Sequence, residues 1–156
     1  MNDLDPGDVV LLQGNLALDV TGSILAAARR VGATTVFNPA PFWPGAETLV
    51  AHCSLVIANR VEAQALGAAL DGVASIVTLG AEGCIYDGRT FPAEKVTAVD
   101  TTGCGDAFCG VMAAALAGGI AIDRAIGLAQ KAAALTATRP GAFDALPSRE
   151  ELSLAR

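Results

Sequence analysis

A glycine-rich stretch that ends in an aspartate is the part of this sequence best suited to chemistry. Gly103, Cys104 and Gly105 lead directly into the first turn of an apolar, alanine-rich stretch that has the composition of a helix. The first backbone amides of a helix have no partner within it and lie at the positive end of its dipole. Such a helix start binds anions, and glycines let a phosphate approach the main chain closely. This stretch is therefore a candidate phosphate site.

Asp106 lies in the same predicted first turn, where its carboxylate would repel a bound phosphate. A carboxylate beside an anion site suits phosphoryl transfer, because the amides take up charge on the moving group while the carboxylate accepts the proton of an attacking hydroxyl. A tight turn followed by a helix-favouring acid explains the same spacing without any ligand. The residues alone leave both interpretations open.

A second candidate is Asn59, which Glu62 follows three residues later. An amide and a carboxylate at the end of a strand suit hydrated Mg²⁺ and the phosphate oxygens of a nucleotide. The same spacing forms a capping box at the start of a helix, and taken alone it favours that structural explanation. Thr78 and Gly80, at the end of another predicted strand, are also ambiguous, because a glycine there often only turns the chain.

The elements that position these residues alternate between β-branched runs and alanine-rich runs, which is typical of parallel βαβ units. Strands are predicted at 9–13, 34–37, 55–58 and 75–79, a hairpin at 84–91, and helices at 23–30, 61–70, 104–117, 123–138 and from 148 onward. The candidate residues directly follow predicted strands, where open α/β sheets bind their ligands. A single α/β domain over residues 1–156 is expected.

The composition excludes several classes of protein. With 156 residues, 53% of them hydrophobic and 17% charged, the chain has the makeup of one folded domain. A net charge of −6 and scattered basic residues argue against a nucleic-acid partner. The longest nearly uncharged stretch, 108–122, is shorter than the roughly 20 residues of a membrane span. The acidic start does not have the pattern of a secretory signal, so a cytoplasmic protein is expected.

In this order, the stretches resemble the carboxyl-terminal half of the ribokinase-like (PfkB) carbohydrate kinases, whose fold is a mostly parallel sheet flanked by helices. The resemblance covers residues 8–147 and depends chiefly on the segment 100–108, which is similar to the family's second signature. Members of the family are about twice this length, and nothing here matches their amino-terminal half, which supplies the lid and most sugar contacts. The chain is therefore expected to be a truncated, nucleotide-binding half.

The resemblance implies transfer of the ATP γ-phosphate to a sugar hydroxyl, with Asp106 as general base and in contact with the sugar. It further implies an anion site at Gly103, Cys104 and Gly105, nucleotide contacts at Asn59, Thr78, Gly80, Gly83 and Gln130, Mg²⁺ organised by Glu62 through water, and K⁺ near Asp100, Thr102, Thr136, Arg139, Gly141 and Ala145. Asn15 falls where ribokinases often have a sugar-contacting glutamate, so the identity of the sugar does not follow.

Two alternatives to a sugar kinase stay open. One is a non-catalytic nucleotide-binding or regulatory module that lacks the acceptor site, and the other is a vitamin or nucleoside kinase of the same superfamily. ATP and a small sugar are the expected partners. If the predicted strand 9–13 normally pairs with the absent half, its unpaired edge favours a homo-oligomer or association with that half.

Overall fold

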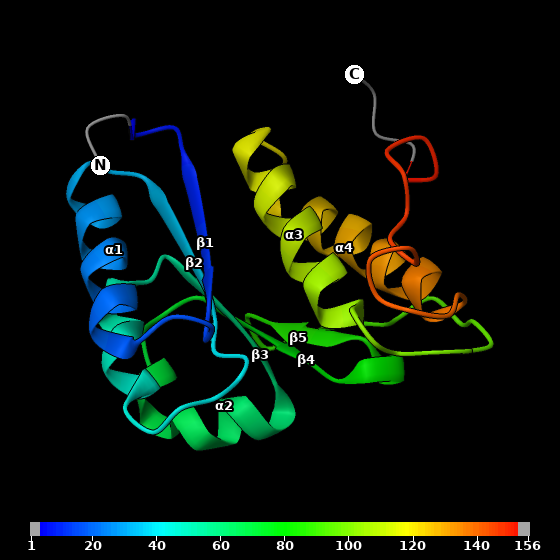
Figure 1. Cartoon of the computed structure of the whole chain (residues 1–156), viewed down its shortest axis with the longest axis horizontal. Coiled ribbons are helices and arrows are strands. Elements are labelled where there is room, and N and C mark those ends of the chain that lie inside the picture. Colours follow the sequence, from blue (N-terminus) through cyan, green and yellow to red (C-terminus); the bar gives the residue numbers. More distant parts are fainter. Residues whose placement is uncertain (1–3, 153–156) are drawn as a thin grey trace. The chain divides into compact units, whose positions relative to one another are not determined.

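The computed structural model describes residues 4–152, which form two compact units. The first unit comprises residues 4–80 and 84–90, and the second comprises residues 81–83 and 91–152. Figure 1 shows the elements in both, coloured along the sequence. The single domain expected over residues 1–156 stays a prediction.

A mostly parallel sheet with strand order β1-β2-β3-β4-β5-β6 is formed by the described residues. Its parallel strands are β1 (Val9–Gln13), β2 (Thr34–Asn38), β3 (Leu55–Asn59) and β4 (Ser75–Thr78). They are followed by β5 (Cys84–Tyr86), which is antiparallel to β4, and by β6 (Arg89–Phe91). The sheet and its flanking helices confirm the expected ribokinase-like fold class.

The turn between β5 and β6 confirms the predicted hairpin. Asp87 has a φ of 50° and Gly88 a φ of 68°. Two consecutive residues in the left-handed region form the tight turn whose twist matches that of the flanking strands. An Asp-Gly pair suits this turn because aspartate tolerates the left-handed region and glycine adopts it without steric cost.

The helices of the first unit pack on an apolar core that includes Leu25, Phe37, Val50 and Val56. These helices are α1 (Leu18–Arg30), α2 (Arg60–Leu66) and two short 3₁₀ helices, η1 (Ala46–His52) and η2 (Gly67–Leu70). The predicted helix 23–30 in fact begins at Leu18 and includes Gly22. A Cβ on Gly22 would come within 3.0 Å of the Leu49 side chain, so glycine fits this position. The predicted helix 61–70 is divided at Gly67, whose φ is 51°.

Two long helices form most of the second unit. They are α3 (Cys104–Ala117) and α4 (Ile122–Ala137), with Gly118 and Gly119 between them, as predicted. Figure 1 shows the two helices side by side, and buried alanines such as Ala107 and Ala132 make this close contact possible. In place of the predicted terminal helix, the described residues 148–152 form one turn, with a Leu152 amide bond to the Ser148 carbonyl of 3.3 Å. The rest of that prediction lies outside the described residues.

Within residues 4–152, no helix has the length and apolar character that crossing a bilayer requires.

Candidate functional site

The residue before α3 has an unusual backbone conformation. Gly103 is the N-cap and has a φ of 78° and a ψ of −5°. The backbone angles favour glycine, and a Cβ at this position would lie only 3.3 Å from the Cα of Ala142, a tight contact. The left-handed turn directs the chain from the preceding loop into the helix.

The N-cap residue of α3 makes no side-chain cap hydrogen bond. Its regular hydrogen-bond ladder begins with the Ala107 amide, which donates to the Gly103 carbonyl at 2.8 Å. Earlier, the Cys104 amide makes a longer bond of 3.3 Å to the Thr101 carbonyl. The N-cap of α3 therefore supplies no acceptor side chain, and a helix start of this kind can bind an anion.

Asp100 organises the segment that leads to this helix. One of its carboxylate oxygens accepts hydrogen bonds from the Thr102 amide at 2.9 Å and from the Thr102 hydroxyl at 2.7 Å. The other oxygen accepts from the Gly141 amide at 3.0 Å, across 41 residues of sequence. These bonds, with the Thr102 amide first, lower the pKa of Asp100, because they favour its charged form. We call this arrangement the Asp100 clasp.

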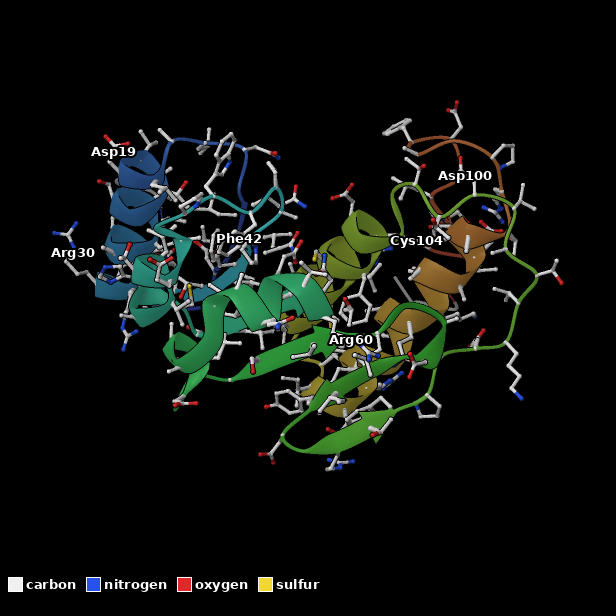
Figure 2. All side chains as sticks on the ribbon, turned by 90° about the horizontal axis from the view of Figure 1, so that it is seen from below. Asp19, Arg30, Phe42, Arg60, Asp100 and Cys104 are labelled. Atoms are coloured by element: carbon white, nitrogen blue, oxygen red, sulfur yellow. The ribbon has the colours of Figure 1, made fainter. Side chains whose placement is uncertain are left out.

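Asp106 and Cys104 differ in their exposure at the first turn of α3. Asp106 is exposed, whereas Ala107 and Phe108, which follow it, are buried. Cys104 is half-buried, and Figure 2 shows it and Asp100 at the start of this helix. Burial, and secondarily the charge of Asp100, raise the pKa of the Cys104 thiol. The thiol therefore stays protonated at neutral pH and adds no negative charge to a phosphate site.

Gly83 and Gln130 both meet the backbone of Phe91. The side-chain amide of Gln130 is buried and donates to the Phe91 carbonyl at 2.7 Å. A Cβ on Gly83, whose φ is 102°, would lie only 2.0 Å from that same carbonyl oxygen. Both residues thus fix the chain after β6, and their contact with a nucleotide stays a prediction.

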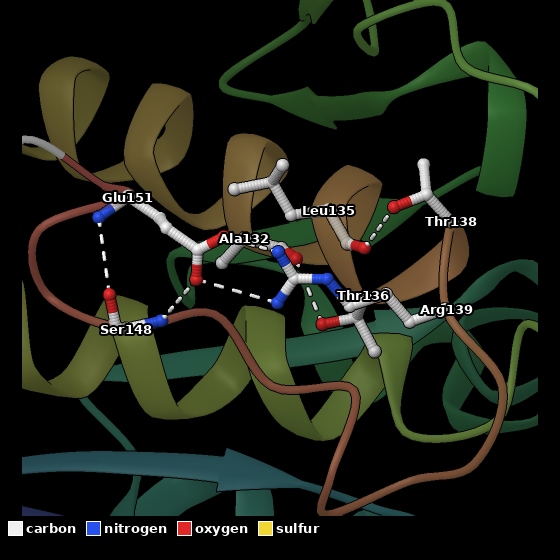
Figure 3. A network of polar contacts seen from close by, with 7 residues as sticks. All are labelled: Ala132, Leu135, Thr136, Thr138, Arg139, Ser148 and Glu151. Carbon is white, nitrogen blue, oxygen red and sulfur yellow. Dashed lines mark hydrogen bonds and ion pairs between the residues drawn. The ribbon is translucent and has the colours of Figure 1, made fainter.

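The residues predicted near a monovalent cation also lie in the second unit. The Thr136 hydroxyl is buried and donates to the Ala132 carbonyl at 2.9 Å, while Arg139 pairs with Glu151 (Figure 3). Ala145 is fully buried, and Gly141 is tied to Asp100. An ionised carboxylate and main-chain carbonyls are hard oxygen donors, which suit such a cation. A K⁺ site at these residues stays a prediction.

In the first unit, Asn59 and Glu62 form the capping box. The Asn59 side chain accepts from the Glu62 amide at 2.9 Å, and the Glu62 carboxylate accepts from the Asn59 amide at 2.9 Å. The second carboxylate oxygen accepts from the Asn59 side chain at 2.7 Å. Burial raises the pKa of Glu62, and the bonds from Asn59 oppose this shift. The structural explanation that the spacing favoured is confirmed.

Magnesium would need ligands beyond Glu62. Among the described residues, no group of three or more His, Cys, Asp or Glu side chains could hold a metal ion. Because both carboxylate oxygens of Glu62 already accept hydrogen bonds, this residue fits an ion held through water, with other oxygens supplied by a nucleotide.

The remaining predicted residues of the first unit lie at the carboxyl ends of its parallel strands. Asn59 and Thr78 are register partners in β3 and β4, and the Thr78 hydroxyl lies 3.4 Å from the Ala58 carbonyl. Gly80 follows with a φ of 61°. The sheet therefore brings Asn59 and Thr78 together, as the position of ligand sites in parallel sheets predicts.

Asn15 belongs to a chain of amides that the motifs did not predict. Its side chain donates to the Gln13 side chain at 3.4 Å, and Gln13 donates to Asn38 at 3.1 Å. Asn38 in turn donates to the Ile57 carbonyl at 2.8 Å. Gln13 and Asn38 are register partners at the ends of β1 and β2. An amide residue at the end of each strand was the signal that could have indicated this contact.

The comparison with protein families identifies the class of this protein. The profile of the pfkB family carbohydrate kinases matches residues 3–149. The chain belongs to this family.

Individual relatives are mainly ribokinases. The ribokinase of Schizosaccharomyces pombe is 29% identical over 170 residues, which cover 93% of this chain and 54% of that protein. The ribokinase structure from Thermotoga maritima is 32% identical, with a TM-score of 0.82, and the match covers 94% of this chain and 55% of that one. A ribokinase from Cryptococcus neoformans, solved in complex with ADP, is 26% identical, with a TM-score of 0.82 and coverages of 93% and 58%. The chain thus spans about half the length of these relatives.

Proposed function

We propose that this chain is the nucleotide-binding half of an ATP-dependent sugar kinase, which transfers the γ-phosphate of ATP to a sugar hydroxyl. The observation that supports this most strongly is the start of α3, where main-chain donors without a capping side chain lie one turn from the exposed carboxylate of Asp106. Membership of the pfkB family and the ADP bound by the Cryptococcus ribokinase agree with a nucleotide substrate.

The chemistry proposed for α3 uses its main chain and one side chain. The amides around Gly103, Cys104 and Gly105 stabilise negative charge on the γ-phosphoryl group. Asp106 accepts the proton of the sugar hydroxyl as the new oxygen–phosphorus bond forms and the bond to the ADP oxygen breaks. The Asp100 clasp fixes the preceding loop, so that the donors do not have to reorganise during the reaction.

The other residues have supporting roles in this proposal. We assign nucleotide contacts to Asn59, Thr78, Gly80, Gly83 and Gln130, and sugar contact to Asn15. Mg²⁺, held through water by Glu62, would neutralise phosphate charge. The proposed cation site binds K⁺ and comprises Asp100, Thr102, Thr136, Arg139, Gly141 and Ala145. An amide at position 15 offers both a donor and an acceptor to sugar hydroxyls.

A nucleotide-binding module without transferase activity is the second candidate function. The observation that favours it is that the relatives match this chain over only about half of their length. Vitamins and nucleosides are further acceptors that the proposal allows.

One experiment separates the candidates. The chain is titrated with ATP by calorimetry, and ADP release is then measured with a panel of sugars, nucleosides and vitamins. Acceptor-dependent ADP release supports the kinase and names its acceptor class. ATP binding without such release supports the module, and no ATP binding at all contradicts both candidates.

The edge of the sheet supports the proposal that the chain associates with another polypeptide. In the described residues, β1 pairs with β2 on one side and ends the strand order on the other. An unpaired strand edge is a template for pairing with another chain. We therefore propose a homo-oligomer or association with an amino-terminal kinase half, which sedimentation of the isolated chain at micromolar concentration tests. A single sharp monomer species would contradict self-association.

A further inference from the structure

The segment after α4 folds back on itself and is closed by an ion pair. We call residues 139–151 the C-terminal loop. At its beginning and end, Arg139 pairs with the Glu151 carboxylate through both terminal nitrogens, one of them at 3.4 Å (Figure 3). Glu151 also accepts from the Ser148 amide at 2.9 Å. The ion pair therefore joins the two ends of the loop.

The C-terminal loop touches the start of α3 at two consecutive residues. The Gly141 amide donates to Asp100 at 3.0 Å, which completes the Asp100 clasp. Ala142 lies against the N-cap Gly103, with its Cα 3.3 Å from the position that a Cβ would occupy. Because the other oxygen of Asp100 holds Thr102, the loop and the α3 start form one connected network.

Exposed and buried residues both occur in the C-terminal loop, and Ala145 in its middle is fully buried. Phe143 is 84% exposed and Leu146 is 39% exposed. In contrast, Leu152, which directly follows Glu151, is buried against Ala107 and Ala132. A surface ion pair alone contributes little, because ordering two long side chains costs entropy. Here the burial of Leu152 already fixes the backbone beside Glu151, so the pair restrains the loop at a lower entropic cost.

We propose that Arg139 and Glu151 are positioning residues for the anion site of α3. They contact neither Asp100 nor the helix start; they close the C-terminal loop, which places the Gly141 amide on Asp100 and Ala142 on Gly103. Without the pair, the loop moves away and Asp100 loses the Gly141 amide. The Asp100 carboxylate, which also accepts from the Thr102 amide, is then held less firmly, and the donors of α3 lose their alignment. The identity of the anion as the ATP γ-phosphate rests on the proposed function.

The first test needs no nucleotide. Hydrogen exchange is measured by NMR for the amides of Gly141 and Thr102 in the wild type, Glu151→Ala, Arg139→Ala and the double variant. Each single change should accelerate exchange about twofold to fivefold, which is the range that an exposed ion pair allows. The double variant should show no more than the larger single effect, because both changes remove one interaction.

Glu150→Ala is the matched control, because it removes a neighbouring carboxylate that does not pair with Arg139. It should leave both amides unchanged. Unchanged exchange in Glu151→Ala, or equal acceleration throughout α3 and α4, would contradict the proposal. If a single variant is unstable, the exchanged pair Arg139→Glu with Glu151→Arg provides the check: it should restore protection of the Gly141 amide, and failure to restore it in a folded protein counts against positioning by charge pairing.

The second test compares ATP with ADP by calorimetry in the same variants. The affinity for ATP should fall by the same factor of about two to five, while the affinity for ADP stays constant, because only ATP has the γ-phosphate. Equal weakening of both nucleotides, or an unchanged ratio, contradicts the inference. If the wild type does not bind ATP at all, the proposed function fails, while the hydrogen-exchange result still decides whether Arg139 and Glu151 position the loop.

Discussion

The helix starts of α2 and α3 differ in how their first amides are held. At α2, Asn59 and Glu62 use both side chains to pair the first amides of the helix. At α3, Gly103 has no side chain, and the carboxylate of the preceding loop, Asp100, bonds to Thr102 and Gly141 and leaves the helix uncapped. A helix start without an N-cap side chain leaves room for a ligand at its first amides. A helix start like that of α3 is therefore suited to binding a ligand, whereas the start of α2 stabilises the helix itself.

The largest effect is expected at the carboxylate of α3. Asp106→Asn should reduce acceptor-dependent ADP release by about 100-fold or more, because a general base contributes on this order. The ATP dissociation constant should change little, since the amides of the helix start are retained. Steady-state kinetics with calorimetry provides the measurement. Turnover close to the wild-type rate would remove Asp106 from the mechanism.

The second largest effect is expected from giving α3 a side chain at its N-cap. Gly103→Ala should destabilise the protein by about 1–3 kcal/mol, because alanine is strained at a φ of 78° and its Cβ crowds Ala142. Thermal unfolding measures the loss. Gly110→Ala is the control on the same helix: it has no neighbour within 4 Å and should be neutral or slightly stabilising. Similar losses in both variants would contradict a special backbone at Gly103.

A smaller effect is expected at α2. Asn59→Ala should lower the free energy of unfolding by about 1 kcal/mol, because the helix loses its cap. Gln64→Ala, an exposed substitution in the middle of the same helix, is the matched control and should change stability little. If Asn59→Ala is as stable as this control in denaturant titrations, the capping box contributes nothing measurable.

The smallest effect concerns acid. Hydrogen bonds lower the pKa of Asp100, so its contribution to stability is present in full above the ordinary value of 3.8 and is lost as the pH falls through the lower pKa. Burial raises the pKa of Glu62 above its ordinary 4.5, which gives the opposite slope. The stability advantage of the wild type over Asp100→Asn should thus shrink on acidification, whereas its difference from Glu62→Gln should shift the other way. Parallel pH profiles of the two variants would contradict these assignments.

Local patterns predicted most of the fold, since strand runs, the Asp-Gly hairpin and the bounds of α3 depend on neighbouring residues. The start of α1 was missed because Gly22 indicates a break in sequence, whereas in the fold its lack of a side chain makes room for Leu49. The capping box of Asn59 and Glu62 was also recognised from local sequence, because its two residues are only three positions apart.

The contacts that local patterns did not predict join distant segments, although the family resemblance implied that Asp100 and Gly141 lie near one cation. Asp100 meets the Gly141 amide, and Gln130 meets the Phe91 carbonyl, because the packing of α3 and α4 returns the chain to its earlier part. Backbone donors and acceptors occur at every position, so no residue type marks these pairings. The glycines at 103 and 141 indicated turns, but only the structure shows that Gly141 bonds to Asp100 and that Gly103 lies against Ala142.

The bond between Asp100 and Gly141 has a consequence for the growing polypeptide. Both long helices lie between its two ends, so the clasp forms only after residue 141 has left the ribosome and α4 has folded back. Up to that moment a nascent chain contains every amide of the helix start but not its fixed orientation. The fixed orientation of this helix start should then be acquired late and abruptly, once both long helices have formed.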